Sequence, residues 1–299
     1  MTTTKNNSIL RFIDWVNGLL DVKNDRSRKA ITLVAIGLFI IGLAVSARRL
    51  DSAIAWQFSS TLLVGMFILL CLTFLVNSLR THTHSRIVGA RLSFGDNAKI
   101  SLFGSAMNML PLVIPAGMVM RMSNFVQHGG HAGHVAGVLG VNYLLVLASS
   151  LLLGFGMLTS TGFEQLRWPL LLICAIYAGT LILFIKLSDI NRGLAIGTLE
   201  LIGVIVDAVR IFVCFHILGF TVEIYQTAVL TVSAVLGSAV SIVPAGLGVR
   251  ELVGATISPL ISVLPAQAFL AIALNRIFGM AFFVGLSGLV LFTDRSKVR

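Results

Sequence analysis

Charged residues are scarce in this chain. Only 11% of its 299 residues are Asp, Glu, Lys or Arg, whereas 57% are hydrophobic and the mean hydropathy is +0.96. The surface of a soluble domain needs more charged residues than this. The composition therefore predicts an integral membrane protein. The net charge of +10 does not indicate a nucleic-acid partner, because the basic residues flank apolar runs and no aromatic-interleaved basic face is present.

Cysteines and enzyme motifs are also scarce. Cys71, Cys174 and Cys214 lie within apolar runs, so we expect small core residues and no disulfide or metal framework. A phosphate-binding glycine loop, a metalloprotease His-Glu motif and a serine elbow are all missing from the sequence. Acidic residues of the kind that a lipid-linked glycosyltransferase needs are few in the expected outer loops. The sequence therefore favours a protein that is not an enzyme and has no cofactor.

The first 29 residues are polar, and the first long apolar run begins near Ala30 without an obvious cleavage site after it. We therefore expect no cleavable signal peptide. Between Ile9 and Leu20 the apolar residues recur at helical spacing. This pattern predicts an amphipathic helix on the cytoplasmic membrane surface, with a helix packed on the soluble side as the alternative.

Long apolar runs predict an all-α polytopic fold. Each of six runs can cross the hydrocarbon core with some tilt. They are 30–47, 54–79, 135–158, 168–187, 193–218 and 266–292. Two further apolar regions, 97–127 and 226–264, are interrupted and predict re-entrant, broken helical hairpins, although two short full crossings per region would fit equally well. Lys and Arg are concentrated in the termini and in the 80–100 loop, which places both termini in the cytoplasm.

Two halves of the chain share a pattern. R-T-H-T-H-S-R-I-V-G begins at Arg80 and R-I-F-V-C-F-H-I-L-G at Arg210, with Arg and Gly at the same spacing. Further on, V-N-Y around Asn142 resembles L-N-R around Asn275. Each half holds three crossings and one hairpin, and an odd number of crossings turns the second copy upside down. We therefore expect a first repeat at 30–160, an inverted second repeat at 161–292 and a cytoplasmic tail at 293–299.

Each half also carries Pro-Ala-Gly followed by three residues and Arg, ending at Arg121 and Arg250. Proline lacks a backbone donor, and a helix broken at membrane depth is tolerated only where protein or water surrounds it. The residues expected to break the helices are Pro115, Gly117, Pro244, Gly246 and Gly248. The arginine then lies near a new helix N-terminus, where an anion is favoured. The alternative is that each arginine extends to the lipid headgroups.

These motifs resemble a known family. NMLPLVIPAGMVMRM and SIVPAGLGVRELVGATIS, with SLR upstream and LNRIFG downstream, are similar to the membrane domain of bacterial lysylphosphatidylglycerol synthases and its stand-alone, flippase-like relatives. The resemblance runs from about Ala30 to Phe292. It implies a bacterial inner-membrane protein with two re-entrant regions that moves a lipid between leaflets. The first copy departs from the pattern, since no acid follows Arg121 and Tyr143 stands where an arginine is expected. The synthase domain is absent, so lipid lysylation is not expected.

Other ionisable residues lie within or near the apolar runs. They are Arg80, Glu200, Asp207, Arg210, Glu251 and Arg276. Asp207 and Arg210 are three residues apart on a helix, which favours a structural ion pair over a gating role. Glu251 could orient Arg250 or carry a coupling proton, and Asp207 and Glu200 are the further coupling candidates. Direct pairing of Glu251 with Arg250 is disfavoured because adjacent helical residues do not face each other.

Histidines are spaced three apart in one Gly-rich segment, H-G-G-H-A-G-H. His128, His131 and His134 could bind Zn²⁺ or sense pH, but no Cys or carboxylate accompanies them. A turn is therefore the favoured interpretation.

Taken with the resemblance, the buried arginines predict a translocase for an anionic lipid, either a phospholipid or a polyprenyl-phosphate-linked one. Arg121 and Arg250 would hold the phosphate near the midplane, while Arg80, Arg210 and Arg276, with Asn142 and Asn275, would line the route. The expected partners are membrane lipids. The alternatives are a small-anion channel or carrier and an accessory subunit of a lipid-modifying enzyme.

Overall fold

The computed structural model describes residues 25–50, 54, 56–109, 116–162, 164–239 and 247–296. These described residues form helices and contain no strand. The first five helices are α2 (Asp25–Arg49), α3 (Ser60–Ile87), α4 (Phe94–Met109), α5 (Ala116–Gln127) and α6 (Ala132–Ser160). The others are η1 (Glu164–Leu166), α7 (Arg167–Leu187), α8 (Ile190–Ile217), α9 (Ile224–Ala239), α10 (Val249–Ile257), η3 (Ser258–Ile261) and α11 (Pro265–Ser296).

Some predictions concern residues outside these ranges. The whole of the expected interfacial helix, the motif residues Pro115, Pro244 and Gly246, and the last three residues of the expected tail are among them. The structure therefore leaves those predictions as they stand.

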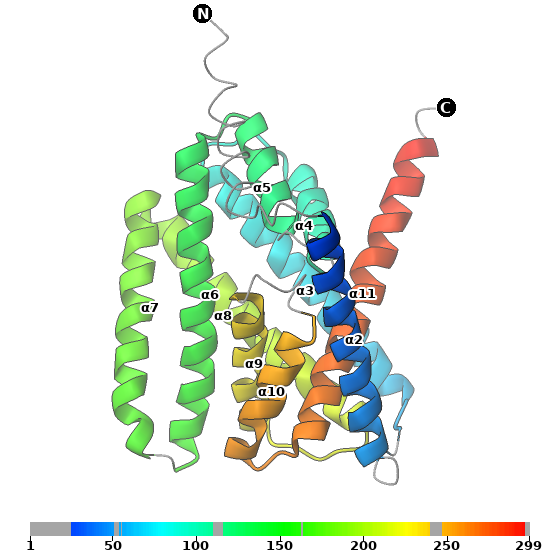
Figure 1. Cartoon of the computed structure of the whole chain (residues 1–299). Helices are drawn as coiled ribbons and strands as arrows, with labels where there is room; N and C mark the ends of the chain where they lie inside the picture. Colours follow the sequence, from blue (N-terminus) through cyan, green and yellow to red (C-terminus); the bar gives the residue numbers. More distant parts are fainter. Residues whose placement is uncertain are drawn as a thin grey trace, which may run out of the picture.

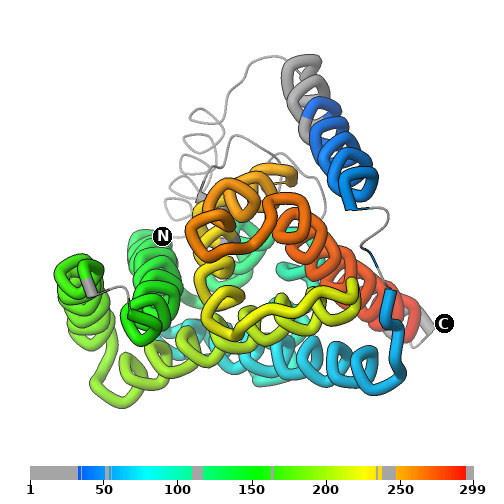
Figure 2. Tube along the Cα trace, turned by 90° about the horizontal axis from the view of Figure 1, so that it is seen from below, coloured from blue at the N-terminus to red at the C-terminus, as the bar shows by residue number. Residues whose placement is uncertain are grey.

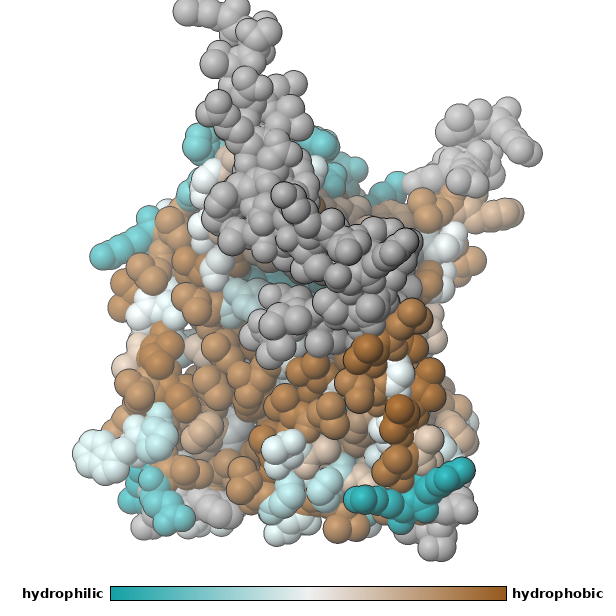
Figure 3. Space-filling model, in the orientation of Figure 1, coloured by the Kyte–Doolittle hydropathy of each residue, from teal (hydrophilic) through white to brown (hydrophobic). Residues whose placement is uncertain are grey.

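The outer surface of the described helices is apolar. Within the described ranges, α3, α6, α7 and α11 are each long and apolar enough to cross a membrane. They expose large hydrophobic side chains such as Phe67 and Leu171. In Figure 3 a hydrophobic band crosses the molecule between polar residues above and below it. The chain is thus a helical membrane protein. The long helix α8 also carries Glu200, Asp207 and Arg210, so its polar side chains must be satisfied inside the protein.

Helix α3 is longer than the sequence predicted. Its N-terminus is fixed by Ser59, whose hydroxyl accepts a hydrogen bond from the Leu62 amide at 3.2 Å. It continues to Ile87, so the prediction of a loop that begins at Arg80 is wrong. The hydropathy pattern breaks at Arg80 because this end of α3 faces a polar interior, where Thr81, His84 and Ser85 are buried.

Helices α3 and α8, each of 28 residues, end in the same kind of turn. Gly89 after α3 and Gly219 after α8 have φ values of 74° and 81°, a region that favours glycine. In each turn the amide of the residue after the glycine donates a hydrogen bond to the carbonyl group five residues earlier. Ala90 donates to Ser85, and Phe220 donates to Phe215. This arrangement satisfies carbonyl groups that the helix end would otherwise leave unpaired, and it sets the direction of the following helix.

The short helices that follow also begin alike. At the start of α4, Ser93 and Asp96 exchange hydrogen bonds, with the Ser93 hydroxyl 2.6 Å from the carboxylate. The hydrogen bonds from Ser93 lower the pKa of the exposed Asp96. At the start of α9 the Gln226 side chain accepts a hydrogen bond from the Glu223 amide at 2.7 Å. Local capping therefore defines where both helices start.

The short helices form two pairs at different heights in the molecule. Figure 1 shows α4 and α5 in its upper half and α9 and α10 in its lower half. Helix α4 packs against α3, α5 and α11, whereas α9 packs against α8, α10 and α6. The long helices α3 and α8 pack against each other. Figure 2 shows α6 and α7 on one side of the molecule and α2 with α11 on the other.

Each short pair has its own hydrophobic core. Phe125, Phe184 and Ile196 are buried in the core near α5, and Phe215 and Leu230 are buried in the core near α9. The cysteines only partly follow the prediction. Cys214 is buried, but Cys71 and Cys174 are exposed on α3 and α7, so their assignment to the core is wrong. An apolar side chain on the lipid-facing side of a membrane helix costs little, so hydropathy does not distinguish the two locations.

Candidate functional site

Five arginines and three carboxylates lie among the interior helices. The arginines are Arg80 on α3, Arg121 on α5, Arg210 on α8, Arg250 on α10 and Arg276 on α11. The carboxylates are Glu200 and Asp207 on α8 and Glu251 on α10. Burying a charge is expensive unless a partner is close, so the pairing of these groups is informative. They divide into a first cluster around Arg80 and Arg121 and a second cluster around Asp207 and Glu251.

In the first cluster, Arg80 links α3 to α8. Its guanidinium donates to the Glu200 carboxylate at 2.6 Å and to the Asn77 amide oxygen at 2.5 Å. The side chain of Glu200 is only 1% exposed. The charge of Glu200 is therefore matched by Arg80, and the two side chains fasten the central helices to each other.

Arg121, in contrast, has no carboxylate within ion-pair distance in the described part of the chain. It interacts electrostatically with Glu200 and repels Arg80, while its Nε is buried without a hydrogen-bond partner. His84 lies close enough to interact with both arginines and contacts the Asn142 side chain. Because Glu200 already pairs with Arg80, it compensates the positive charge of Arg121 only in part.

The start of α5 is held close to α4 around Gly117. The Gly117 amide donates to the Asn108 side chain at 2.9 Å. A Cβ on Gly117 would overlap the Gly104 carbonyl oxygen and the Asn108 amide. A larger residue would thus push the two helices apart, which explains the glycine in the first Pro-Ala-Gly motif.

In the second cluster, Asp207 contacts three groups. It lies 3.0 Å from an Arg250 nitrogen, 3.8 Å from an Arg210 nitrogen and 3.2 Å from the Asn275 amide nitrogen. The expected Asp207–Arg210 pair is therefore present, and Arg250 is the nearer partner. The side chains of Arg250 and Asp207 are 21% and 23% exposed, so this ion pair is not sealed in the interior.

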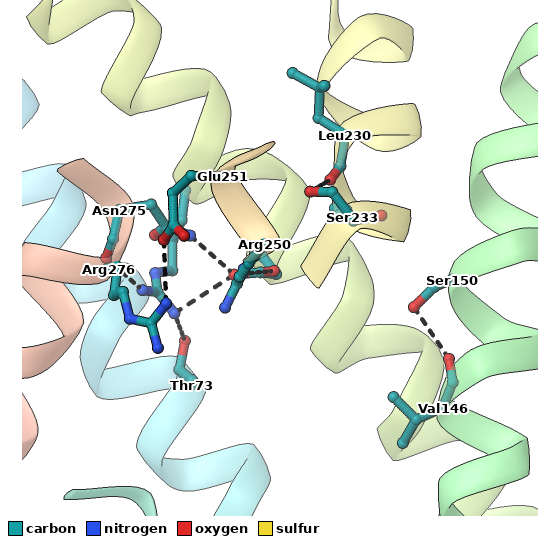
Figure 4. Close-up of polar contacts among 12 residues, drawn as sticks. Thr73, Val146, Ser150, Leu230, Ser233, Arg250, Glu251, Asn275 and Arg276 are labelled. Carbon is teal, nitrogen blue, oxygen red and sulfur yellow. Dashed lines mark hydrogen bonds and ion pairs between the residues drawn. The ribbon is translucent and has the colours of Figure 1, made fainter. Parts of the chain in front are cut away.

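Glu251 performs a different task. Its side chain is fully buried and accepts hydrogen bonds from the Gly248 amide at 2.9 Å and from Arg276 at 3.1 Å. Gly248 has a φ of 80°, so glycine suits this start of α10. Figure 4 shows Glu251 and Arg276 pointing toward each other from α10 and α11, with Asn275 beside them. Glu251 thus fixes the position of α10, and with it Arg250.

Close packing of a glycine also positions Arg250. A Cβ on Gly237 of α9 would lie 2.6 Å from the Arg250 Cα, so the backbones of α9 and α10 are in close contact at this point. The position of Arg250 therefore depends on the packing of α9 as well as on that of α11.

We expect Gly237→Ala to displace Arg250 and α10 and to lower the thermal midpoint, although it removes no charged group. The readout is the thermal midpoint of the purified protein in detergent. Gly137→Ala on α6 is the matched control, because a Cβ there meets no atom within 4 Å. Equal thermal midpoints of the two variants would contradict the importance of this packing.

The three histidines do not gather. His128 bonds with the Asn124 carbonyl at 2.7 Å, while His134 lies within α6, 3.3 Å from the Ile87 carbonyl. His131 immediately precedes α6. Across the described ranges there is no group of three His, Cys, Asp or Glu residues that could hold a metal ion.

Several buried polar atoms near the arginines have no hydrogen-bond partner among the described residues. In the first cluster they are Arg80 Nε, Arg121 Nε, Glu200 Oε1 and Asn142 Oδ1. In the second cluster they are Arg210 Nε, Arg250 Nε and Asn275 Oδ1. Such groups need water or a ligand. The arginine nitrogens suit the oxygens of a phosphate, so the arrangement is a candidate anion site.

Three contributors to the site were missed by sequence reasoning: Asn77, which binds Arg80; Asn108, which binds the Gly117 amide; and Thr73, 3.5 Å from Arg210. Thr73 gives no sequence signal, because its contact joins distant parts of the chain. Asn77 does, since it precedes Arg80 by three residues as Asp207 precedes Arg210.

No family model matches this chain, and no curated protein matches it significantly. The site is therefore interpreted from its own geometry.

Proposed function

We propose that this protein translocates an anionic lipid, a phospholipid or a polyprenyl-phosphate-linked lipid, across the bacterial inner membrane. The observation that carries the proposal is the charge imbalance inside the helical bundle: five arginines face three carboxylates, and Arg121 lacks a carboxylate partner among the described residues. An interior positive charge is costly in a membrane protein, and such charges typically mark the pathway of a substrate. A positive charge favours a negatively charged substrate.

The proposal includes an inverted repeat, which four similarities between the two halves support. Helices α3 and α8 each have 28 residues, and α4 and α9 each have 16. The turns at Gly89 and Gly219, 130 residues apart, are of the same kind. Helix α4 packs on α11 and α9 on α6, as expected if two equivalent halves exchange their short helices. The two short pairs would then be re-entrant hairpins from opposite leaflets, and Arg121 and Arg250 would approach the midplane from the two sides.

In this proposal the headgroup passes along the arginines while the acyl or prenyl chains stay in the bilayer. Arg121 and Arg250 bind the phosphate, and Arg80, Arg210 and Arg276 line the route. Asn142 and Asn275 offer polar groups without charge. Rocking of one half against the other would open the site to each leaflet in turn, with both termini on the cytoplasmic side.

A small-anion channel or carrier would use the same arginines. The partial exposure of Arg250 and Asp207 is compatible with either function. The two differ in whether the site opens sideways to lipid, because a channel needs a closed, water-lined pore.

The proposal is tested in vesicles that contain the purified protein, fluorescent lipids and an entrapped anion reporter. We expect an impermeant reductant to bleach fluorescent phosphatidylglycerol in both leaflets, with slower loss of fluorescent phosphatidylcholine and no rapid anion flux. Anion flux without lipid movement would instead identify a channel. Movement of neither would refute both functions for these substrates.

A further inference from the structure

One of the differences between the two halves of the site concerns the residue three before an arginine. Asn77 and Asp207 each lie three residues before an arginine, Arg80 or Arg210, and are 130 residues apart in the chain. The first half therefore carries a neutral amide where the second carries a carboxylate. The amide oxygen of Asn77 accepts a hydrogen bond from Arg80 but adds no negative charge. In the second half that carboxylate is a counter-ion of the motif arginine Arg250.

Asp207 occupies the anion-binding face of Arg250. Its carboxylate oxygen lies 3.0 Å from the Arg250 terminal nitrogen, and its other oxygen accepts a hydrogen bond from Asn275 at 3.2 Å. A phosphate bound by two parallel hydrogen bonds would use the unpartnered Arg250 Nε together with the terminal nitrogen that Asp207 occupies. Since both side chains remain about one fifth exposed, an incoming anion can reach this pair. Bidentate binding of a phosphate at Arg250 thus requires Asp207 to be displaced.

Arg121 presents the opposite situation. The carboxylate that interacts electrostatically with Arg121 is that of Glu200. This carboxylate already accepts a hydrogen bond from Arg80 at 2.6 Å. No carboxylate in the described part of the chain lies within ion-pair distance of Arg121. An anion can therefore bind Arg121 without displacing an internal group, while Arg250 is occupied in the same conformation.

We propose that Asp207 is an internal competitor of the anionic substrate at Arg250. Asp207 blocks Arg250 before the substrate arrives, and it later expels the bound phosphate from Arg250. This inference rests on the proposed function and assigns a regulatory role to the second cluster. The phosphate binds first at Arg121, exchanges with the Asp207 carboxylate at Arg250, and leaves when the carboxylate returns. Asp207 consequently limits affinity and promotes release.

Asp207→Asn should bind an anion more tightly and release it more slowly. Asparagine is compatible with this position, since Asn77 occupies the related one beside Arg80. We expect the affinity for short-chain phosphatidylglycerol to rise about tenfold and the transport rate at saturation to fall. The reverse change, Asn77→Asp, should add a carboxylate next to Arg80 in the cluster that contains Arg121 and lower the affinity by a similar factor.

The experiment measures binding of two probes, inorganic phosphate and short-chain phosphatidylglycerol, to the full-length protein in detergent by calorimetry. Tighter binding of both probes indicates recognition of the shared phosphate, whereas a gain for the lipid alone indicates recognition of the headgroup in its lipid context; either supports the proposal. Asp189→Asn is the matched control because it makes the same charge change on α8, about 27 Å away along the helix. Asp189 accepts the Arg192 amide hydrogen bond as a helix cap, which asparagine can also do.

Adding Arg250→Ala to Asp207→Asn should remove the gain in affinity. An unchanged or weaker affinity of folded Asp207→Asn, or an equal gain in Asp189→Asn, would overturn the proposal. If Asp207→Asn does not fold, Asn77→Asp decides: weaker binding supports the competitor, and unchanged binding overturns it. Failure of the wild-type protein to bind either probe or to move lipid would refute the proposed function itself, and this inference with it.

Discussion

Arg121→Ala should abolish most lipid transport while leaving the protein as thermally stable as the wild type. Loss of about two charge-assisted hydrogen bonds, each worth about 1.5 kcal/mol, corresponds to roughly a 100-fold loss of substrate affinity. Stability should not fall, because Arg121 has no described carboxylate that its removal would leave unpaired, and its repulsion with Arg80 is relieved. Vesicle transport and the thermal midpoint in detergent measure the two effects.

Arg80→Ala is the matched control for this prediction. It removes the same charge in the same cluster but leaves the buried Glu200 carboxylate without its 2.6 Å partner. We expect a clear drop in its thermal midpoint. If Arg121→Ala is destabilised as strongly as Arg80→Ala, Arg121 has a structural role that contradicts its assignment as an open anion site.

Glu251→Leu should be the most destabilising substitution in the site. It removes a fully buried carboxylate and leaves both Arg276 and the Gly248 amide without their bonds to Glu251. Breaking a buried ion pair from one side typically costs about 3–5 kcal/mol. We therefore expect little folded protein or a much lower thermal midpoint, measured by size-exclusion chromatography after heating.

Replacing both partners tests the cause of this loss. The double variant Glu251→Leu with Arg276→Met also removes the arginine that loses its bond to Glu251, and it should be more stable than Glu251→Leu alone. Glu251→Gln is a further control, because its amide oxygen can still accept the Gly248 hydrogen bond. A double variant as unstable as the single one would show that the Gly248 bond, and not the ion pair, is the important interaction.

Helices could be predicted from the sequence because an apolar run of membrane length has few alternatives to a helix that satisfy its backbone hydrogen bonds. The run at 135–158 became α6 at Ala132–Ser160, and the run at 168–187 became α7 at Arg167–Leu187. The end of α3 could not be predicted in this way, since polar residues at its last two turns face the protein interior. Hydropathy reports how polar a residue is and not whether the protein or the lipid surrounds it.

Within the site, local spacing predicted only local contacts. Asp207 and Arg210 were recognisable as a pair because they are three residues apart on one helix. The Arg80–Glu200 pair spans 120 residues and depends on the packing of α3 against α8, which spacing does not reveal. Glu251 was predicted to orient Arg250 or carry a proton, and spacing did not reveal that it contacts Gly248 and Arg276. Tertiary packing therefore determines which charges are matched and which remain open.

The most direct test of the central claim, that the two motif arginines serve an anionic lipid, is headgroup reduction in vesicles with wild-type protein and with Arg250→Ala. We expect the wild type to expose fluorescent phosphatidylglycerol from the inner leaflet and the variant to leave about half of it protected, as in protein-free vesicles. The variant should remain folded, since Asp207 keeps Arg210 and Asn275 as partners. Wild-type rates of lipid movement in folded Arg250→Ala would contradict the account.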